Sequence, residues 1–142
     1  MFGIDKEEQY RAVADFRSAL RHFLAATDTS VRAHGLTPGQ YDLLVMCEAA
    51  GAEGATITSL AARLALAGNS VTELVDRAVA AGVAVRHPDQ LDGRVTRVRP
   101  TDAGRERLAA AVATLTPERR RLLELLADVS ERLATHTRHS AS

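Results

Sequence analysis

The sequence predicts a mainly α-helical winged helix-turn-helix fold, with long helices at both ends of the chain and a small β-hairpin wing. Two short amphipathic helical patterns follow one another between residues 58 and 81, with Gly68-Asn69 between them. Two segments of alternating apolar and polar residues come next and predict a hairpin. Helix, tight turn, helix and hairpin in this order are typical of proteins whose second helix enters a DNA major groove.

The first two helices are predicted by the spacing of apolar residues and by helix-capping residues. A long amphipathic helix is expected over about residues 5–34, because its apolar residues recur every three or four positions. A second helix is expected from Pro38 to about Ala50. Thr37 and Gln40 have the spacing of a capping box there, and proline suits the first helical position.

The helix-turn-helix is expected to follow a short candidate strand over residues 55–57. Thr58 is expected to cap the third helix, and the fourth is expected from about Asn69 to Ala81, after a turn at Gly68-Asn69.

The hairpin and the last two helices complete the prediction. Strands are expected over residues 83–86 and 94–99, with a sharp tip at Asp92-Gly93. Thr101 is suited to cap a fifth helix, and Thr116-Pro117 to begin a sixth. We therefore expect one domain over residues 1–142, in which residues 37–100 form the DNA-binding lobe and approximately residues 5–34 and 102–138 form dimerisation helices.

The composition fits a cytoplasmic protein, nucleoid-associated when bound to DNA, and no membrane partner is expected. No apolar run is long enough to span a bilayer, and the single cysteine, Cys47, excludes an internal disulfide framework. The formal net charge is zero, which is unusual for a DNA-binding protein. Residues 58–107, however, carry eight Arg against six Asp and Glu, an excess of two positive charges on the expected lobe.

The segment from Leu36 to Leu108 resembles the MarR (multiple antibiotic resistance regulator) family of bacterial transcription factors. Five matches occur in the expected order: LTPGQYDLL, SLAARLALAGNSVTELVDR, GVAVR, DGR at the hairpin tip, and VRPTDAGRERL. The resemblance implies a homodimer with interleaved terminal helices that binds double-stranded DNA at a palindromic operator, and we expect it to act as a repressor. It also implies that a small phenolic or anionic effector is a possible partner.

Two positions depart from the family pattern. Glu73 stands where relatives often carry Arg, and Ala78-Val79 stands where a Leu-Glu pair is usual. Glu73 places a negative charge where DNA is expected to lie, so the operator sequence that this protein prefers is expected to differ from that of relatives with Arg.

The candidate DNA-binding residues lie on the fourth helix and on the hairpin: Asn69, Ser70, Thr72, Glu73, Arg77, Arg86, Gln90 and Arg94. Arg77 has the chemistry to bond guanine and Glu73 to accept from cytosine N4, whereas Ser70 and Thr72 suit phosphates. The resemblance assigns Arg94 to the minor groove, where negative potential concentrates. The alternative for Arg94 is a solvated side chain that pairs with Asp92 or Asp76. For Asp76 and Arg77 the alternative is a structural ion pair with each other, and this is the preferred interpretation of Asp76.

Three further groups of residues are candidates for other roles. The dimer interface is expected to use an apolar stripe of the sixth helix, formed by Leu122, Leu126, Val129 and Leu133, with Leu123 and Leu125 beside it. Arg17, Arg21 and His22 of the first helix are interpreted as part of a solvated helix face. The alternative is that they line a pocket that binds an anion. Cys47 is interpreted as a buried inert thiol, with a peroxide sensor as the alternative.

No catalytic constellation competes with this interpretation. The sequence has no nucleophile elbow, phosphate-binding loop, zinc signature or dinucleotide fingerprint, so we expect no enzyme activity and no cofactor. His136 and His139 are close together, but no metal site is expected there. The alternative function is a winged-helix protein-interaction module without specific DNA binding.

Overall fold

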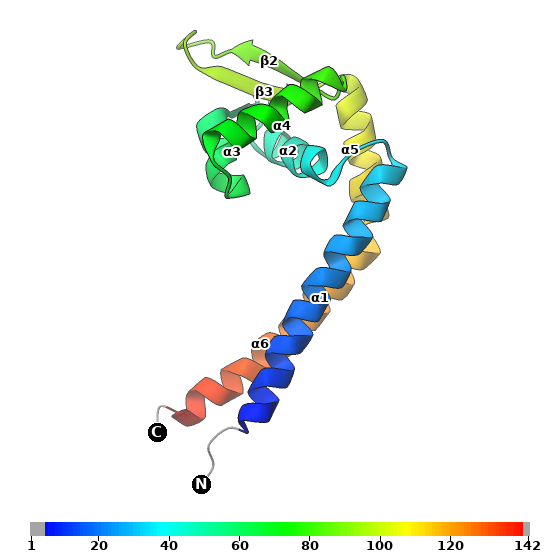
Figure 1. Cartoon of the computed structure of the whole chain (residues 1–142), viewed down its shortest axis with the longest axis vertical. Helices are drawn as coiled ribbons and strands as arrows, with labels where there is room; N and C mark the ends of the chain where they lie inside the picture. Colours follow the sequence, from blue (N-terminus) through cyan, green and yellow to red (C-terminus); the bar gives the residue numbers. More distant parts are fainter. Residues whose placement is uncertain (1–4, 141–142) are drawn as a thin grey trace. The chain divides into compact units, whose positions relative to one another are not determined.

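A computed structural model describes residues 5–140, with side chains as far as Thr135. It confirms the expected fold class: helices predominate, and one small sheet completes the winged helix (Figure 1). The elements in chain order are α1 (Lys6–Ala33), α2 (Pro38–Ala49), β1 (Ala55–Thr56), α3 (Ile57–Leu64), α4 (Gly68–Ala80), β2 (Ala84–Pro88), β3 (Thr96–Pro100), α5 (Asp102–Thr114) and α6 (Thr116–Ser140).

The chain divides into two compact units. One contains residues up to Thr29 and from Thr114 onward, and the other contains Ser30–Ala113. The second unit, called here the winged lobe, has a core built from α2, α3, α4 and the sheet. Its largest fully buried side chains include Leu43, Leu44, Leu60, Val71, Val75 and Val98. Burial of apolar surface of this kind is the main force that holds such a lobe together.

The sheet of the winged lobe is antiparallel, with strand order β1-β3-β2. Ala55 pairs with Val98, and Ala84 pairs with Pro100. The expected short strand is therefore confirmed, whereas the hairpin strands lie one to two residues further along the chain than predicted. The middle strand contacts both neighbours, so a side chain on β3 can reach the loops before β1 and after β2.

The helix caps confirm one prediction and correct another. Thr37 caps α2 in a complete capping box: the Gln40 backbone N donates to Thr37 Oγ1 at 3.1 Å, and the Thr37 backbone N donates to Gln40 Oε1 at 3.0 Å. The prediction of Thr58 as the cap of the third helix is wrong. Thr56 caps α3, because its hydroxyl oxygen accepts from the Ser59 backbone N at 3.1 Å.

The turn between α3 and α4 also differs from the prediction. Ala65 ends α3 in the left-handed conformation, with φ 54° and ψ 44°, and α4 already begins at Gly68. The prediction placed the turn at Gly68-Asn69, and glycine is the residue that most easily adopts positive φ. Here an alanine adopts it, so Gly68 and Asn69 belong to the first turn of α4.

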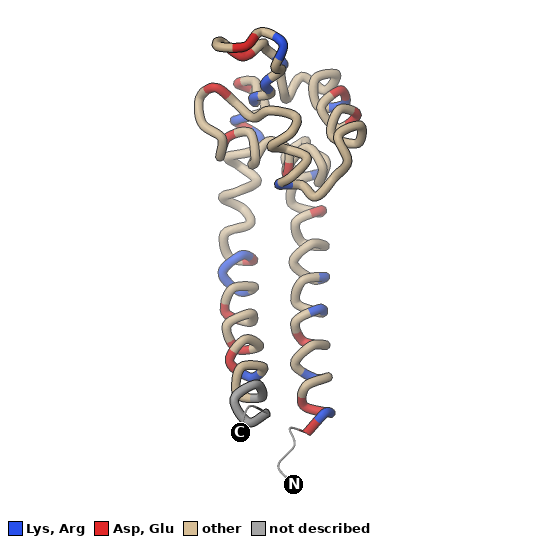
Figure 2. Tube along the Cα trace, turned by 90° about the vertical axis from the view of Figure 1, so that its left-hand side faces the viewer, with Lys and Arg blue, Asp and Glu red and all other residues tan. Residues whose placement is uncertain are grey.

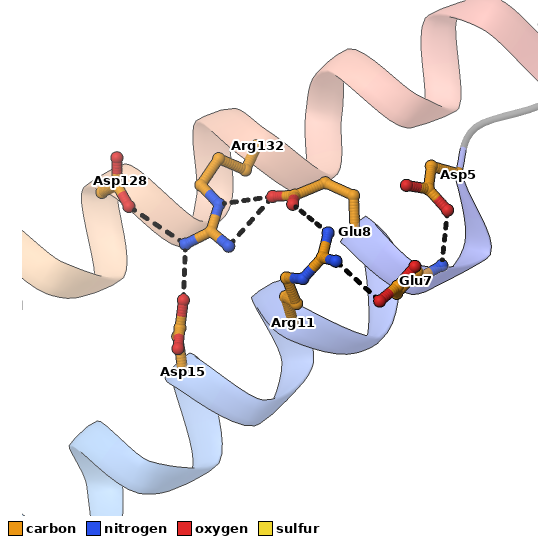
Figure 3. Close-up of polar contacts among 7 residues, drawn as sticks. All are labelled: Asp5, Glu7, Glu8, Arg11, Asp15, Asp128 and Arg132. Carbon is orange, nitrogen blue, oxygen red and sulfur yellow. Dashed lines mark hydrogen bonds and ion pairs between the residues drawn. The ribbon is translucent and has the colours of Figure 1, made fainter.

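The other unit, called here the helical arm, contains most of α1 and all of α6. Arg132 of α6 lies between Glu8 and Asp15 of α1 and also contacts Asp128 of its own helix (Figure 3). Its guanidinium is 2.7 Å from Asp15 Oδ2 and 3.0 Å from Glu8 Oε1. Arg132 holds the pKa of the Glu8 carboxyl below its ordinary value, so this cluster joins the two helices as an ion pair network at neutral pH.

No described helix combines the length and the apolar character that crossing a bilayer would require.

Candidate nucleic-acid interface

Helix α4 has one buried and one exposed face. Val71, Val75 and Ala78 are completely buried against the core of the winged lobe. The candidate residues predicted for this helix all lie on the exposed side: Asn69, Ser70, Thr72, Glu73 and Arg77. Three- and four-residue spacing produces this division, because it puts the apolar side chains on one stripe of the helix. The structure thus brings these five candidates together on one surface.

The hydroxyl of Thr72 is engaged within its own helix. Thr72 Oγ1 donates to the Gly68 carbonyl oxygen at 3.0 Å. A hydroxyl carries only one hydrogen, so this bond must break before Thr72 can donate to a phosphate oxygen.

Arg86, another candidate, is held by an ion pair from β2 to α4. Its guanidinium donates to Asp76 Oδ1, and the Arg86 side chain is about one-third exposed. The partner predicted for Asp76, Arg77, is therefore wrong. Arg77 keeps its exposed position on α4, whereas Arg86 must leave Asp76 or share it in order to contact DNA.

The hairpin tip carries Arg94, whose side chain is 92% exposed. Asp92 Oδ1 accepts from both the backbone N and Nε of Arg94, each at 3.1 Å. One of the two expected pairings, with Asp92, is thus present, and most of the Arg94 side chain remains exposed. Gln90 is exposed in the same loop. Figure 2 shows acidic and basic residues adjoining at this tip.

Arg97 lies at the base of the wing and was not among the site residues predicted from the sequence. Its Nε donates to Asp89 Oδ1, and its Nη1 donates to the Gly54 carbonyl oxygen at 3.0 Å. The hydrogen bond from Arg97 lowers the pKa of the Asp89 carboxyl, with help from the backbone N of Asp92. Alternation in the strand predicted only that Arg97 belongs to the polar face. Its partners come from separate loops, and no local signal identifies them.

A groove of about 370 Å³ lies in the helical arm. It is lined by apolar and charged residues of α1 and α6, among them Phe23, Leu122, Arg121, Asp128 and His22. Of the three predicted ligand contacts only His22 lines this groove; Arg17 and Arg21 do not, and both are exposed. Among the described residues no cluster of three or more potential metal ligands occurs, and the side chains of His136 and His139 lie outside that part of the chain.

The apolar stripe predicted on α6 is partly covered within the chain. Val129 is buried, and Leu122, Leu126 and Leu133 are half-buried. The neighbouring side chains are more exposed, Leu123 at 60% and Leu125 at 45%. Helix α1 also presents exposed apolar residues, Tyr10, Val13, Phe16 and Leu24.

Cys47 is fully buried in α2. Burial and the neighbouring charge of Glu48 raise the pKa of its thiol to about 12. Because the thiolate is the reactive form, these surroundings favour the inert interpretation of Cys47 over the sensor.

Comparison with known proteins agrees with this geometry. A model of the MarR family matches residues 34–95, which include α2, the helix-turn-helix and the hairpin tip. The chain is also 27% identical to an uncharacterised HTH-type transcriptional regulator, YkoM, of Bacillus subtilis, over 95% of this chain and 94% of the relative.

Two solved structures extend the likeness over the whole fold. CouR from Rhodococcus jostii, bound to p-coumaroyl-CoA, is 27% identical with a TM-score of 0.67, over 84% of this chain and 83% of CouR. A MarR variant from E. coli, in complex with operator DNA, is 19% identical with a TM-score of 0.69, over 89% of this chain and 90% of that one. The family match over residues 34–95 and the shared winged helix lead to one conclusion: this segment is similar to the MarR family of transcription regulators, and the chain has the fold of the solved MarR structure.

Proposed function

We propose that the protein is a homodimeric repressor that binds a palindromic operator and is released from it by a small effector. The observation that carries the proposal is the exposed surface of α4, with Ser70, Glu73 and Arg77 outward and its apolar residues buried. A recognition helix needs such a surface, because only exposed side chains reach base edges in the major groove. Arg94 on the hairpin tip adds a guanidinium suited to the minor groove.

The homodimer is supported by apolar side chains that the described chain leaves uncovered on both helices of the helical arm. Tyr10 is 73% exposed, Leu24 63% and Leu123 60%. Large exposed apolar surfaces mark interaction sites, and a second copy related by a two-fold axis would cover this one. Two winged lobes would then read two half-sites, about one helical turn apart.

Effector release is supported by the groove in the helical arm and by the ligand of the similar CouR protein. The groove combines apolar walls, such as Phe23 and Leu122, with His22 and Arg121. The lining also contains Asp15, Glu118 and Asp128, so the groove suits a small ligand with an aromatic ring and a polar group such as a phenol or a carboxylate. Arg17 and Arg21 do not line the groove and form no part of this proposal.

The test is footprinting of the purified protein on the DNA that flanks its own gene, followed by a salt series. We expect one protected palindrome and a steep fall of affinity with salt, with a log–log slope of about −0.9 for each phosphate neutralised. Aromatic carboxylates added to the complex should then release the DNA. Absence of protection together with a flat salt response would contradict the proposal and favour a protein-interaction module.

A further inference from the structure

None of residues 89–95, which form the tip of the wing, is buried. Leu91 is 98% exposed, and Arg94 is linked in this chain to Asp92. Two backbone hydrogen bonds close the loop: Asp89 N to the Val95 carbonyl oxygen at 2.8 Å, and Val95 N to the Asp92 carbonyl oxygen at 3.0 Å. The position of the tip therefore depends on polar contacts rather than on a core.

Asp89 organises the loop through both of its carboxylate oxygens. Oδ2 accepts from the backbone N of Leu91 and from that of Asp92, each at 3.0 Å. Oδ1 accepts from Arg97. The Asp89 side chain is only 12% exposed, so water competes weakly for these bonds.

Arg97 connects this loop to a rigid part of the winged lobe. Its second bond goes to the carbonyl oxygen of Gly54, and Glu53 lies 4.0 Å from its Nη2. Gly54 has φ +83°, and a Cβ built there would lie 2.3 Å from the Val98 carbonyl oxygen, so its backbone is closely packed on β3. The contacts thus run from Gly54 through Arg97 and Asp89 to the backbone of Asp92, whose carboxylate holds Arg94.

We propose that Arg97 is a positioning residue for DNA binding: through Asp89 it holds the wing tip so that Arg94 is oriented before it meets the minor groove. This inference rests on the proposed function, because it assumes that Arg94 contacts DNA. Ordering a mobile side chain and its loop lowers affinity, and an arrangement formed in advance avoids that loss. A loss of the arrangement should weaken binding by about three- to tenfold.

Two substitutions remove the contact with opposite changes in charge. Arg97→Gln removes a positive charge, whereas Asp89→Asn removes a negative one and keeps an oxygen to accept from Leu91 N and Asp92 N. If the charges act only through their field on DNA, Asp89→Asn should strengthen binding. If positioning decides, both variants should weaken it. Arg120→Gln on α6, an exposed arginine of the other unit, is the control for charge alone.

The experiment measures two quantities for each variant. Amide hydrogen exchange of residues 89–95 is recorded without DNA, and affinity is recorded by fluorescence anisotropy on a duplex that the wild type selects from a random library. In both variants the amides of the wing should exchange faster, and DNA should bind about three- to tenfold more weakly. Arg120→Gln should have a much smaller effect on both the exchange rate and the affinity. In an Arg94→Ala background, Arg97→Gln and Asp89→Asn should cost no further affinity.

The outcomes separate this inference from the proposed function. Three results would overturn the positioning role alone. They are unchanged hydrogen exchange in the wing, tighter DNA binding by Asp89→Asn, and a loss of affinity that is as large in the Arg94→Ala background as in the wild type. Failure of the wild type to select any duplex would instead overturn the proposed function, whatever the exchange data show, and the positioning role with it. Should Arg97→Gln not fold, Asp89→Asn carries the same comparison.

Discussion

A Cβ atom on Gly104 would lie 2.1 Å from the carbonyl oxygen of Val83, so the first turn of α5 packs directly on the backbone that leads into β2. Thr101 strengthens this junction. Its backbone N donates to the Val83 carbonyl oxygen at 3.1 Å, and its Oγ1 donates to the Gly82 carbonyl oxygen at 2.6 Å. The base of the wing therefore depends on a close contact that only glycine permits at position 104.

Gly104→Ala should lower the free energy of unfolding by about 1–3 kcal/mol, because the added methyl group must push the Val83 backbone away. Urea denaturation followed by circular dichroism measures the effect. Gly68→Ala is the control, since Gly68 is also helical and has nothing within 4 Å of an added Cβ. That change should be neutral or stabilise by about 0.5–1 kcal/mol. Equal effects of the two substitutions would contradict this account of Gly104.

Arg94→Ala should weaken binding to most duplexes and reduce the salt slope by about one phosphate's share, because we propose that its guanidinium lies in the minor groove and attracts the DNA electrostatically. The preferred half-site should remain nearly the same. Selection from a random duplex library, followed by a salt series, checks both parts. A changed half-site preference would show that Arg94 reads bases.

Glu73→Gln distinguishes two roles of the exposed carboxylate on α4. If Glu73 accepts from cytosine, the change should cost about 1–3 kcal/mol at one base pair and relax the preference there. If it only repels phosphate, binding to all sequences should become tighter. The same library selection measures the result. An unchanged affinity and preference would mean that α4 does not place Glu73 near DNA.

Leu123→Glu should convert a dimer to monomers, because it puts an unpaired charge on an apolar surface that we propose a second copy covers. Analytical ultracentrifugation at micromolar concentration measures this. Leu123 is a better position than Leu126, which is half-buried within the chain, so that a charge there would also disturb folding. Leu91→Glu, at a 98% exposed position on the wing, should leave the dimer intact. A monomeric wild type would refute the dimer.

Cys47 should react slowly with thiol reagents at neutral pH, because the pKa of its buried thiol is raised to about 12. The pH dependence of stability follows from the ionisation of this thiol in the folded and in the unfolded chain. Below pH 9.0 the thiol is neutral in both, whereas above it the unfolded chain ionises first, so stability should fall between pH 9.0 and about 12. Colorimetric thiol titration of the native and the urea-unfolded chain provides the comparison. Equally fast reaction of both would contradict the burial argument.

Local signals predicted much of the fold. The capping box of Thr37 and Gln40 involves atoms three residues apart, so the chain near α2 specifies it without help from the rest of the molecule. The same reasoning placed Thr101 correctly, since its Oγ1 accepts from the Gly104 backbone N at 3.1 Å. Apolar spacing likewise predicted which side of α4 is buried, because the period of the helix decides which residues share a face.

Tertiary structure decided the rest, wherever the partners are distant in sequence. Ala65 adopts positive φ although Gly68 is three residues away, and in this conformation the backbone N atoms of Ala65 and Leu66 both donate to the Ala61 carbonyl oxygen at the end of α3. Asp76 pairs with Arg86 instead of its neighbour Arg77, and Arg97 bonds to a carbonyl oxygen that lies 43 residues earlier. The sequence by itself determined the order of helices and strands and the exposed face of α4. The contacts that orient the wing exist only once β1, β2 and β3 have paired, because strand pairing brings their side chains within hydrogen-bonding distance.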